Sequence, residues 1–300
     1  MSKGRRVVIR QLPSGVPGLD LVLGGGVPEG SFSLIAGAPG AGKTTLAQQF
    51  VFANATPQRP ALFFTVLGET AVKMLRHQQQ YTFFDPEKVG ESIRFVNLGD
   101  DVIERGLEGA LERIIEEVEK MDAAFVVVDS FRSLTQSLQA DSAAKLQIPG
   151  VLQRLAMHLT TWQVTSLLVG EYDDEDRSTN PIFTIADTIL WLAQETEKSS
   201  VVRKLQVVKV RGQEPMPGLH TYRITNNGLQ VFPRSVLAVG EAERETPSGR
   251  SSIGVTGLDE MMHGGIPTGD SVLVAGPSGS GKSVLATQFI TAGKEHGEAG

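Results

Sequence analysis

Residues 37–45 read Gly-Ala-Pro-Gly-Ala-Gly-Lys-Thr-Thr and fit the pattern G-x-x-x-x-G-K-[ST]. An apolar run over residues 32–36 precedes this segment, and a stretch compatible with a helix follows it over residues 45–52. A strand, a glycine-rich loop and a helix N-terminus in this order predict a phosphate-binding loop, because backbone N–H groups and the helix dipole both attract anions there. The segment therefore predicts a nucleoside triphosphate site, and a chance glycine-rich turn is the less favoured alternative.

The loop also predicts which residues contact the nucleotide. Lys43 is expected to reach the β- and γ-phosphates, and the Thr44 hydroxyl is expected to occupy one Mg²⁺ position. The predicted ATP-binding set consists of two cations further along the chain and nine residues of the loop: Lys209, Arg211, Gly37, Ala38, Pro39, Gly40, Ala41, Gly42, Lys43, Thr44 and Thr45.

Two acidic residues that follow apolar runs are the candidate partners of this loop. Asp129 ends the run 125–129, and an acid at the carboxyl end of a buried strand can hold the water shell of Mg²⁺. Glu69 follows the run 60–67, where its carboxylate could polarise the attacking water or activate a protein hydroxyl. The alternatives are a plain strand-end acid for Asp129 and a solvated turn glutamate for Glu69.

The order of the apolar segments predicts an α/β fold. Buried parallel strands are predicted by three apolar runs, residues 60–67, 125–129 and 164–170. Residues 103–120 carry apolar side chains at helical spacing from Ile103 onward, and a helix over 151–159 is expected to begin near Pro149. Later apolar runs have short connections, including the hairpin turn Asn226-Asn227-Gly228. We therefore expect a mostly parallel sheet with flanking helices and a C-terminal antiparallel extension.

The chain repeats itself once. Residues 252–289 repeat residues 13–50 without a gap, so that a second loop appears with Gly279, Gly281, Lys282 and Ser283. We expect a complete domain over residues 1–234, a polar linker over 235–251, and the N-terminal fragment of a second domain over 252–300. The fragment is expected to contribute no hydrolysis, because it has no counterpart of Asp129 or Glu69.

Composition excludes some classes of protein. The 300 residues carry a net charge of −6 and no cysteine, which excludes disulfides, thiolate metal sites and cysteine nucleophiles. The negative charge, and the acidic run 171–176, which we expect to be a solvated loop, make nucleic acid an unfavoured partner. No apolar run is long enough for a membrane span, so we expect a cytoplasmic protein without membrane association.

Lys209 and Arg211 form a candidate catalytic pair at the end of an apolar strand. Alternation places both side chains on one side of the strand, and no acidic residue within two positions on that strand neutralises them. The γ-phosphate of an adjoining subunit is a natural anion for such a pair, as in an arginine finger. The alternative is a solvated strand edge.

These features resemble the KaiC-like ATPases of the RecA superfamily, the family of the bacterial circadian-clock ATPase and kinase. The resemblance covers residues 13–233 and 252–300 and rests on the phosphate loop and on five further segments: Gly18-Leu19-Asp20, Gly25-Gly26-Val27-Pro28, residues 126–130, Ile185-Ala186-Asp187-Thr188 and Lys209-Val210-Arg211-Gly212. It implies a RecA-type core, ATP held between subunits of a hexameric ring, and slow hydrolysis coupled to conformational change. Some members phosphorylate their own Ser and Thr residues, and their acceptor pair aligns with Phe183 and Thr184 of this chain.

The residues and the resemblance together favour a Mg²⁺-dependent, ring-forming ATPase with a regulatory or signalling role. Thr184 is its candidate site of Ser/Thr autophosphorylation. The expected partners are ATP, further copies of the chain that share active sites, and a regulatory protein. Two alternatives stay open: a DNA-handling motor of the recombinase or helicase kind, and a nucleotide-gated scaffold with little turnover.

Overall fold

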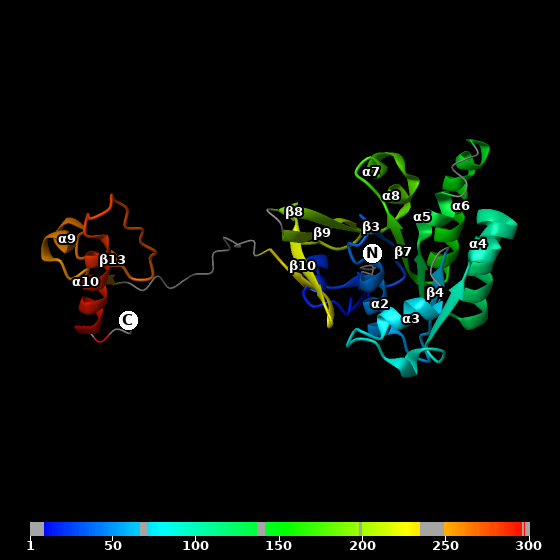
Figure 1. The fold of residues 1–300 in the computed structure, drawn as a ribbon, viewed down its shortest axis with the longest axis horizontal. Coiled ribbons are helices and arrows are strands. Elements are labelled where there is room, and N and C mark those ends of the chain that lie inside the picture. The colour runs from blue at the N-terminus through cyan, green and yellow to red at the C-terminus, as the bar shows by residue number, and fades with distance from the viewer. Residues whose placement is uncertain are drawn as a thin grey trace, which may run out of the picture. The chain divides into compact units, whose positions relative to one another are not determined.

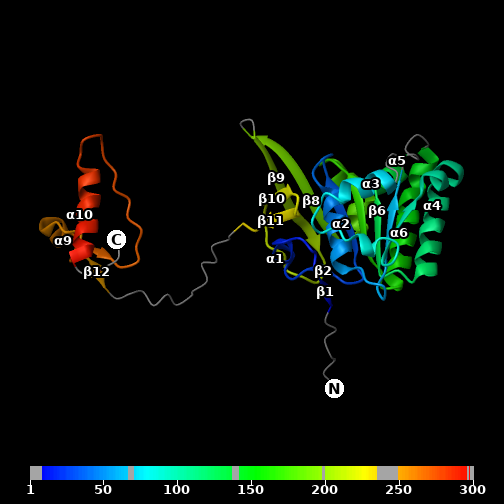
Figure 2. The same ribbon diagram turned by 60° about the horizontal axis from the view of Figure 1, so that its bottom comes forward.

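The computed structural model describes residues 9–66, 71–136, 142–197, 200–234, 249–295 and 297. The chain divides into two compact units, Met1–Arg234 and Ser235–Gly300, which are drawn in Figures 1 and 2. None of the helices in the described residues is long and apolar enough to cross a membrane.

One large sheet forms the centre of the first unit. Among the described residues it holds nine strands in the order β11-β10-β9-β8-β3-β7-β6-β4-β5. The strands from β8 to β5 run parallel, whereas β9, β10 and β11 extend the sheet with antiparallel pairs, so the predicted architecture is confirmed. The strand bounds are β3 Phe32–Gly37, β4 Ala61–Thr65, β5 Ile93–Asn97, β6 Phe125–Asp129, β7 Thr165–Glu171, β8 Thr188–Glu197, β9 Ser200–Val210, β10 His220–Thr225 and β11 Gly228–Phe232.

Helices cover both faces of this sheet because its strands carry apolar side chains on both sides. On β6, Phe125 and Val127 pack into one core, and Val126 and Val128 pack into the other. The first core is shared with α1 (Leu19–Leu23), α2 (Lys43–Asn54) and α3 (Ala71–Gln78). The second core is shared with α4 (Gly99–Met121), α5 (Phe131–Gln136), α6 (Ser142–Thr161) and α8 (Pro181–Ile185). The remaining short elements are β1 Gln11–Leu12, β2 Val27–Pro28, the 3₁₀ turn Pro86–Lys88 and α7 Asp176–Thr179.

Two details of the helical layer differ from the sequence-based prediction. Ile103 is 73% exposed rather than part of the apolar face, whereas the neighbouring Val102 is buried. Gly106, with φ 66°, interrupts α4 just after this turn, so one helical spacing does not run through residues 103–120. Pro149 lies inside α6 rather than near its start. Ile148 and Leu152 are both buried beside it, so packing holds the helix together across the hydrogen bond that proline cannot donate.

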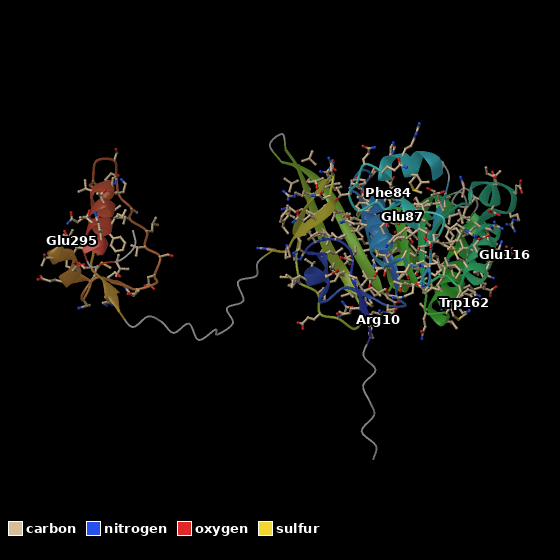
Figure 3. The ribbon with its side chains drawn as sticks, turned by 90° about the horizontal axis from the view of Figure 1, so that it is seen from below. Arg10, Phe84, Glu87, Glu116, Trp162 and Glu295 are labelled. Carbon is tan, nitrogen blue, oxygen red and sulfur yellow. The ribbon has the colours of Figure 1, made fainter. Side chains whose placement is uncertain are left out.

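The layer of α4 and α6 has exposed side chains on its outer surface, among them Glu116 of α4 and Met157 of α6. In Figure 3 Glu116 of α4 and Trp162, which directly follows α6, project away from the sheet. Trp162 is 38% exposed. The described part of this surface lies on the face of the sheet opposite α2.

The sheet ends at β11, and the outer side of this strand is covered by neighbouring segments. Gln49 of α2 donates from Nε2 to the Leu229 carbonyl oxygen at 3.2 Å and accepts from the Leu229 N–H at 2.8 Å. The N–H of Val231 donates to the Pro17 carbonyl oxygen at 2.9 Å. The antiparallel extension is therefore tied to the helix that begins at the phosphate loop.

The second unit contains the same local contacts as the start of the first. Its strands β12 (Arg250–Ser251) and β13 (Ile266–Pro267) pair in the register of β1 and β2, and α9 (Thr256–Met261) and α10 (Lys282–Glu295) follow. Asp259 accepts a hydrogen bond from the Ile253 N–H at 2.7 Å, as Asp20 accepts one from the Ser14 N–H at 2.8 Å. The repeat in the sequence thus corresponds to a repeat in local structure.

Candidate nucleotide-binding site

The phosphate loop connects the end of β3 to the start of α2. Gly42 is the N-cap of α2 with φ 90°, a conformation that favours glycine. The side chain of Lys43 is buried, and its Nζ donates to the Ala38 carbonyl oxygen at 2.7 Å. The predicted strand, loop and helix are therefore all present, with the lysine folded back over the loop.

Thr44 and Asp129 meet beside this loop. The Thr44 hydroxyl donates to Oδ2 of Asp129 at 2.6 Å. The strand order explains this contact. β3 leads into the loop and β6 ends at Asp129, and both strands pair with β7, which lies between them. Both residues line a cavity of about 330 Å³ together with Gly40, Gly42, Lys43, Thr45, Tyr81, Ser130, Val169, Gly170, Glu171 and Ile224.

These residues fit a magnesium ion bound together with a nucleotide. Mg²⁺ prefers oxygen ligands and is usually held by one or two protein oxygens plus phosphates and water. The Thr44 hydroxyl and the Asp129 carboxylate supply such oxygens, whereas the described residues contain no group of three acids, histidines or cysteines that could hold a metal alone. The Thr65 hydroxyl, in register with Asp129 on the neighbouring strand, is buried without a hydrogen-bond partner in the described part of the chain. An additional oxygen is thus available next to the acid.

Tyr222 and Ile224 of β10 support the loop from the antiparallel extension, and no signal in the sequence identified them. The buried Tyr222 hydroxyl donates to the Ala41 carbonyl oxygen at 2.5 Å. Burial raises the pKa of Tyr222 far above its ordinary value, so the hydroxyl stays a donor. A Cβ added to Gly42 would lie 2.4 Å from Cδ1 of Ile224, so these groups are already in close contact. The sequence shows only that both residues belong to an apolar run over 219–224.

Burial and nearby charges shift the pKa of Lys43 in opposite directions. Burial lowers the pKa of its ammonium group, and the carboxylates of Glu171 and Asp129 raise it in part. Glu171 belongs to the run predicted to be a solvated loop. That prediction is wrong for part of the run, because Tyr172 is buried and Asp176 forms an ion pair with Arg132.

Lys209 and Arg211 do not join the phosphate loop of their own chain. The neighbouring Val210 pairs with Thr188 at the start of β8, so the pair lies at the end of the parallel strands opposite the loop. Arg211 forms an ion pair with Asp187 at 3.0 Å, an acid on a neighbouring segment that the pattern of one strand does not reveal. The Nζ of Lys209 donates to the Thr184 carbonyl oxygen at 3.0 Å, and burial and the Arg211 cation lower the pKa of Lys209.

The geometry of this site does not include two of the predicted groups. Glu69 lies outside the described residues, so its role stays a prediction. The second loop, with Gly279, Gly281, Lys282 and Ser283, belongs to the other unit. There the Nζ of Lys282 donates to the Gly276 and Pro277 carbonyl oxygens at 2.9 and 2.7 Å, much as Lys43 does in the first loop.

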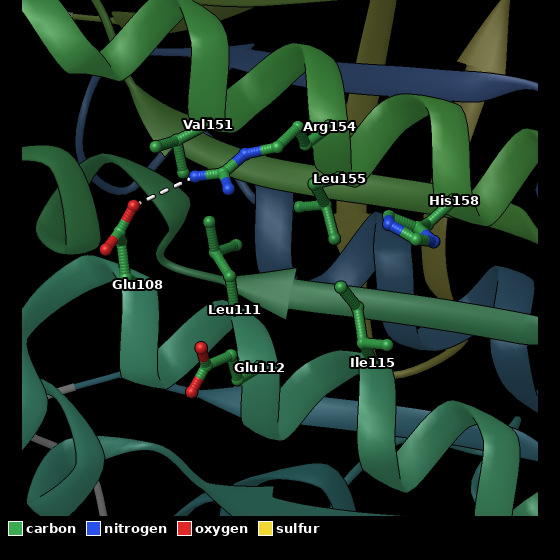
Figure 4. Close-up of a pocket in the computed structure, with 8 residues that line it drawn as sticks. All are labelled: Glu108, Leu111, Glu112, Ile115, Val151, Arg154, Leu155 and His158. Atoms are coloured by element: carbon green, nitrogen blue, oxygen red, sulfur yellow. Dashed lines mark hydrogen bonds and ion pairs between the residues drawn. The ribbon is translucent and has the colours of Figure 1, made fainter.

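A second cavity of the first unit lies between α4 and α6 and contains no predicted site residue (Figure 4). It measures about 130 Å³, and Glu108 and Arg154, which form an ion pair at 2.9 Å, are among the residues that line it. Leu111, Ile115 and Leu155 give it an apolar wall. It belongs to the face of the sheet opposite the phosphate loop.

The chain is similar to known proteins over most of its length. The family model described as "ATPase: KaiC" matches residues 12–236 and 251–300. The circadian clock oscillator protein KaiC of Prochlorococcus marinus (strain MIT 9313) is 29% identical over 94% of this chain and 57% of its own, and that of Rippkaea orientalis is 28% identical over 97% and 56%. The chain thus spans a little over half the length of these relatives.

A solved structure gives the same result for the fold. The crystal structure of a KaiC-like protein from the hyperthermophilic archaeon Pyrococcus horikoshii OT3 superimposes with a TM-score of 0.65 at 28% identity, covering 75% of this chain and all of that chain. With a family model that matches both repeats and a phosphate loop that contacts a strand-end acid, this chain belongs to the KaiC ATPase family.

Proposed function

We propose that the first unit binds ATP with Mg²⁺ and hydrolyses it to ADP and inorganic phosphate. The observation that carries this proposal is the hydrogen bond of 2.6 Å between Thr44 and Asp129, formed in a cavity that Lys43 also lines. A hydroxyl and a carboxylate held together beside a phosphate loop are the protein ligands that a Mg²⁺–triphosphate complex needs.

The residues of the cavity divide the work of binding. Lys43 would leave its present acceptor, the Ala38 carbonyl oxygen, and donate to the β- and γ-phosphates. Thr44 and Asp129 would hold Mg²⁺, which supplies charge neutralisation at the phosphate oxygens when bound. Tyr222 would keep the loop backbone in place through Ala41.

The test compares ATP binding and ADP release in three proteins. Lys43→Ala should lose ATP binding and remain folded, because the hydrogen bond that the lysine makes with a described residue is to its own loop. Lys120→Ala, which changes an exposed lysine at the end of α4, should bind and turn over ATP as the unchanged protein does. Unaltered ATP affinity in Lys43→Ala, or an unchanged protein without ADP release, would refute the proposal.

A motor that handles DNA is the main rival, and the surface charge argues against it. The segment that follows β7 carries Asp173, Asp174 and Glu175 as exposed acids, and phosphate contacts need cations. Binding of single-stranded DNA that falls steeply with salt would support the rival. Turnover that DNA leaves unchanged would support a regulatory ATPase.

The proposal extends to a ring, as a homo-oligomer with six subunits in which each site is completed by a neighbour. Support comes from Lys209 and Arg211, which lie too far along the sheet to reach the loop of their own chain. Arg211 is exposed beyond its contact with Asp187 and so can reach a neighbouring subunit. Mass measurement with and without ATP tests the ring.

Mixing of variants tests the shared site. Arg211→Ala should bind ATP but hydrolyse it poorly, because an arginine finger supplied in trans contributes about 10³- to 10⁵-fold in rate. Mixed with Glu69→Gln, it should regain activity at interfaces that pair an intact glutamate with an intact arginine. If rings of confirmed mixed composition stay inactive at every ratio, the site is complete within one subunit.

We further propose a regulatory or signalling role that involves a protein partner. The names of the curated relatives give circadian timing as their role. We also propose autophosphorylation at Thr184. Thr184 is exposed, and its carbonyl oxygen accepts from Lys209, so this residue lies at the same end of the sheet as the candidate finger. Incubation with ATP and Mg²⁺ followed by mass spectrometry tests it. An unmodified peptide around Thr184 would exclude the autokinase activity.

A further inference from the structure

The end of β7 lies between the two halves of the candidate site. In the sheet, β7 pairs with β3, which leads into the phosphate loop, and with β6, which ends at Asp129. Glu171 is opposite Gly37 on one side, and Val169 is opposite Asp129 on the other. A side chain at the end of β7 is therefore placed between the start of the phosphate loop and Asp129.

The alternation of side chains along β7 places Glu171 on the face of the sheet that α2 covers. Leu167 and Val169 pack into the core shared with α2, and Glu171 is the next residue on that side. Its side chain lines the nucleotide cavity with Lys43 and Asp129. The cavity thus contains two carboxylates rather than one.

The two carboxylates differ in what they already bind. Asp129 accepts a hydrogen bond from the Thr44 hydroxyl, and these two groups are the candidate Mg²⁺ ligands. The carboxylate of Glu171 makes no hydrogen bond or ion pair with any residue that the structure describes. It is therefore free to accept a proton from a water molecule.

The backbone around Glu171 is held firmly, as a catalytic group requires. The N–H of Tyr172 donates to the Gly37 carbonyl oxygen at 3.4 Å, which ties the strand end to the start of the phosphate loop. The Tyr172 ring is buried below the Arg132 guanidinium, 4.9 Å from its centroid, and Arg132 also pairs with Asp176. Glu171 thus begins an anchored segment rather than a free loop.

We propose that Glu171 is the general base of the hydrolysis, a catalytic role additional to or in place of that expected for Glu69. This inference rests on the proposed ATPase function. The water oxygen forms a bond to the γ-phosphorus while the bond from that phosphorus to the β–γ bridging oxygen breaks. The electron pair of the broken bond stays on ADP, where Lys43 offsets its charge, and the proton of the water passes to the Glu171 carboxylate and then to solvent.

The test uses Glu171→Gln, which keeps the size of the side chain and removes its basicity. Its matched control is Glu175→Gln, the same change four residues further on, at an exposed side chain that makes no hydrogen bond with a residue that the structure describes. For each variant the turnover number is measured from ADP release, and the ATP dissociation constant is measured separately with Mg²⁺ and a non-hydrolysable analogue.

Glu171→Gln is expected to lower turnover by about 10²- to 10⁴-fold, the usual contribution of a positioned acid or base, with analogue affinity within about threefold of the unchanged protein. Glu175→Gln should match the unchanged protein in both measurements. Turnover of Glu171→Gln within about threefold, or a loss confined to affinity, would overturn the inference. The unchanged protein and Lys43→Ala test the ATPase function itself, so the two failures are distinguishable.

Discussion

Removing one hydroxyl from Tyr222 should destabilise the first unit measurably. Tyr222→Phe deletes the hydroxyl that donates to the Ala41 carbonyl oxygen. Ala41 is fully buried, and no other described residue donates a hydrogen bond to this oxygen. A buried carbonyl left without a partner costs about 1–3 kcal/mol. For a unit of this size, each kcal/mol corresponds to a shift in Tm of about 2–4 °C. We therefore expect the midpoint to fall by about 2–12 °C, the product of these two ranges.

Tryptophan fluorescence provides a suitable assay, because Trp162 and Trp191 both belong to the first unit and the sequence has no others. Tyr81→Phe is the matched control, since the structure records no hydrogen bond from the Tyr81 hydroxyl to a described residue and its ring stacks on Phe83. Urea unfolding should therefore separate the two variants by about 1–3 kcal/mol. Equal midpoints for Tyr222→Phe and Tyr81→Phe would show that the contact does not hold the loop.

Three further outcomes are expected from the geometry of the loop and of its repeat. Asp129→Asn should raise the Mg²⁺ concentration needed for half-maximal turnover by about tenfold or more, since an amide lacks the charge that binds the ion; an unshifted Mg²⁺ titration would contradict this. Lys282→Ala should leave turnover unchanged, because the second loop lacks the contact that Thr44 makes with Asp129 in the first. Its counterpart, Ser283, is exposed, and its hydroxyl donates no hydrogen bond to a described residue; a loss in the ADP assay would assign activity to the second loop. Gly42→Ala should destabilise, because φ is 90° there, whereas Gly150→Ala, in an exposed part of α6, should stabilise by about 0.8–1 kcal/mol; urea midpoints that shift in the same direction would refute the contrast.

The parts of the site predicted from the sequence are those that depend on local order. The phosphate loop is a contiguous pattern whose flanking strand and helix are visible beside it, and Asp129 ends an apolar run that has no other polar residue. Both assignments need only the rule that parallel strands bring their carboxyl ends to one edge of the sheet. The fold class was predictable for the same reason.

The parts that were missed depend on contacts between distant segments. The acidity of 171–176 suggested a solvated loop, whereas in the structure Glu171 ends β7 and lines the cavity. The pattern of one strand could not place an acid near Arg211, because Asp187 reaches it from the adjacent segment. Helical spacing alone does not reveal that α4 is interrupted at Gly106 and that Ile103 is exposed.

The contact between Gln49 and Leu229 also covers part of the edge of the sheet. A strand at the edge of a sheet exposes N–H and C=O groups that can pair with the same strand of another molecule. The Gln49 amide occupies both of these groups on Leu229, and Pro17 occupies the N–H of Val231, so the outer side of β11 offers little to a second strand. Because the amide comes from the helix that starts at the phosphate loop, displacement of that helix would leave the N–H and C=O groups of Leu229 unpaired. A nucleotide that holds the helix in place would then also disfavour strand pairing between molecules.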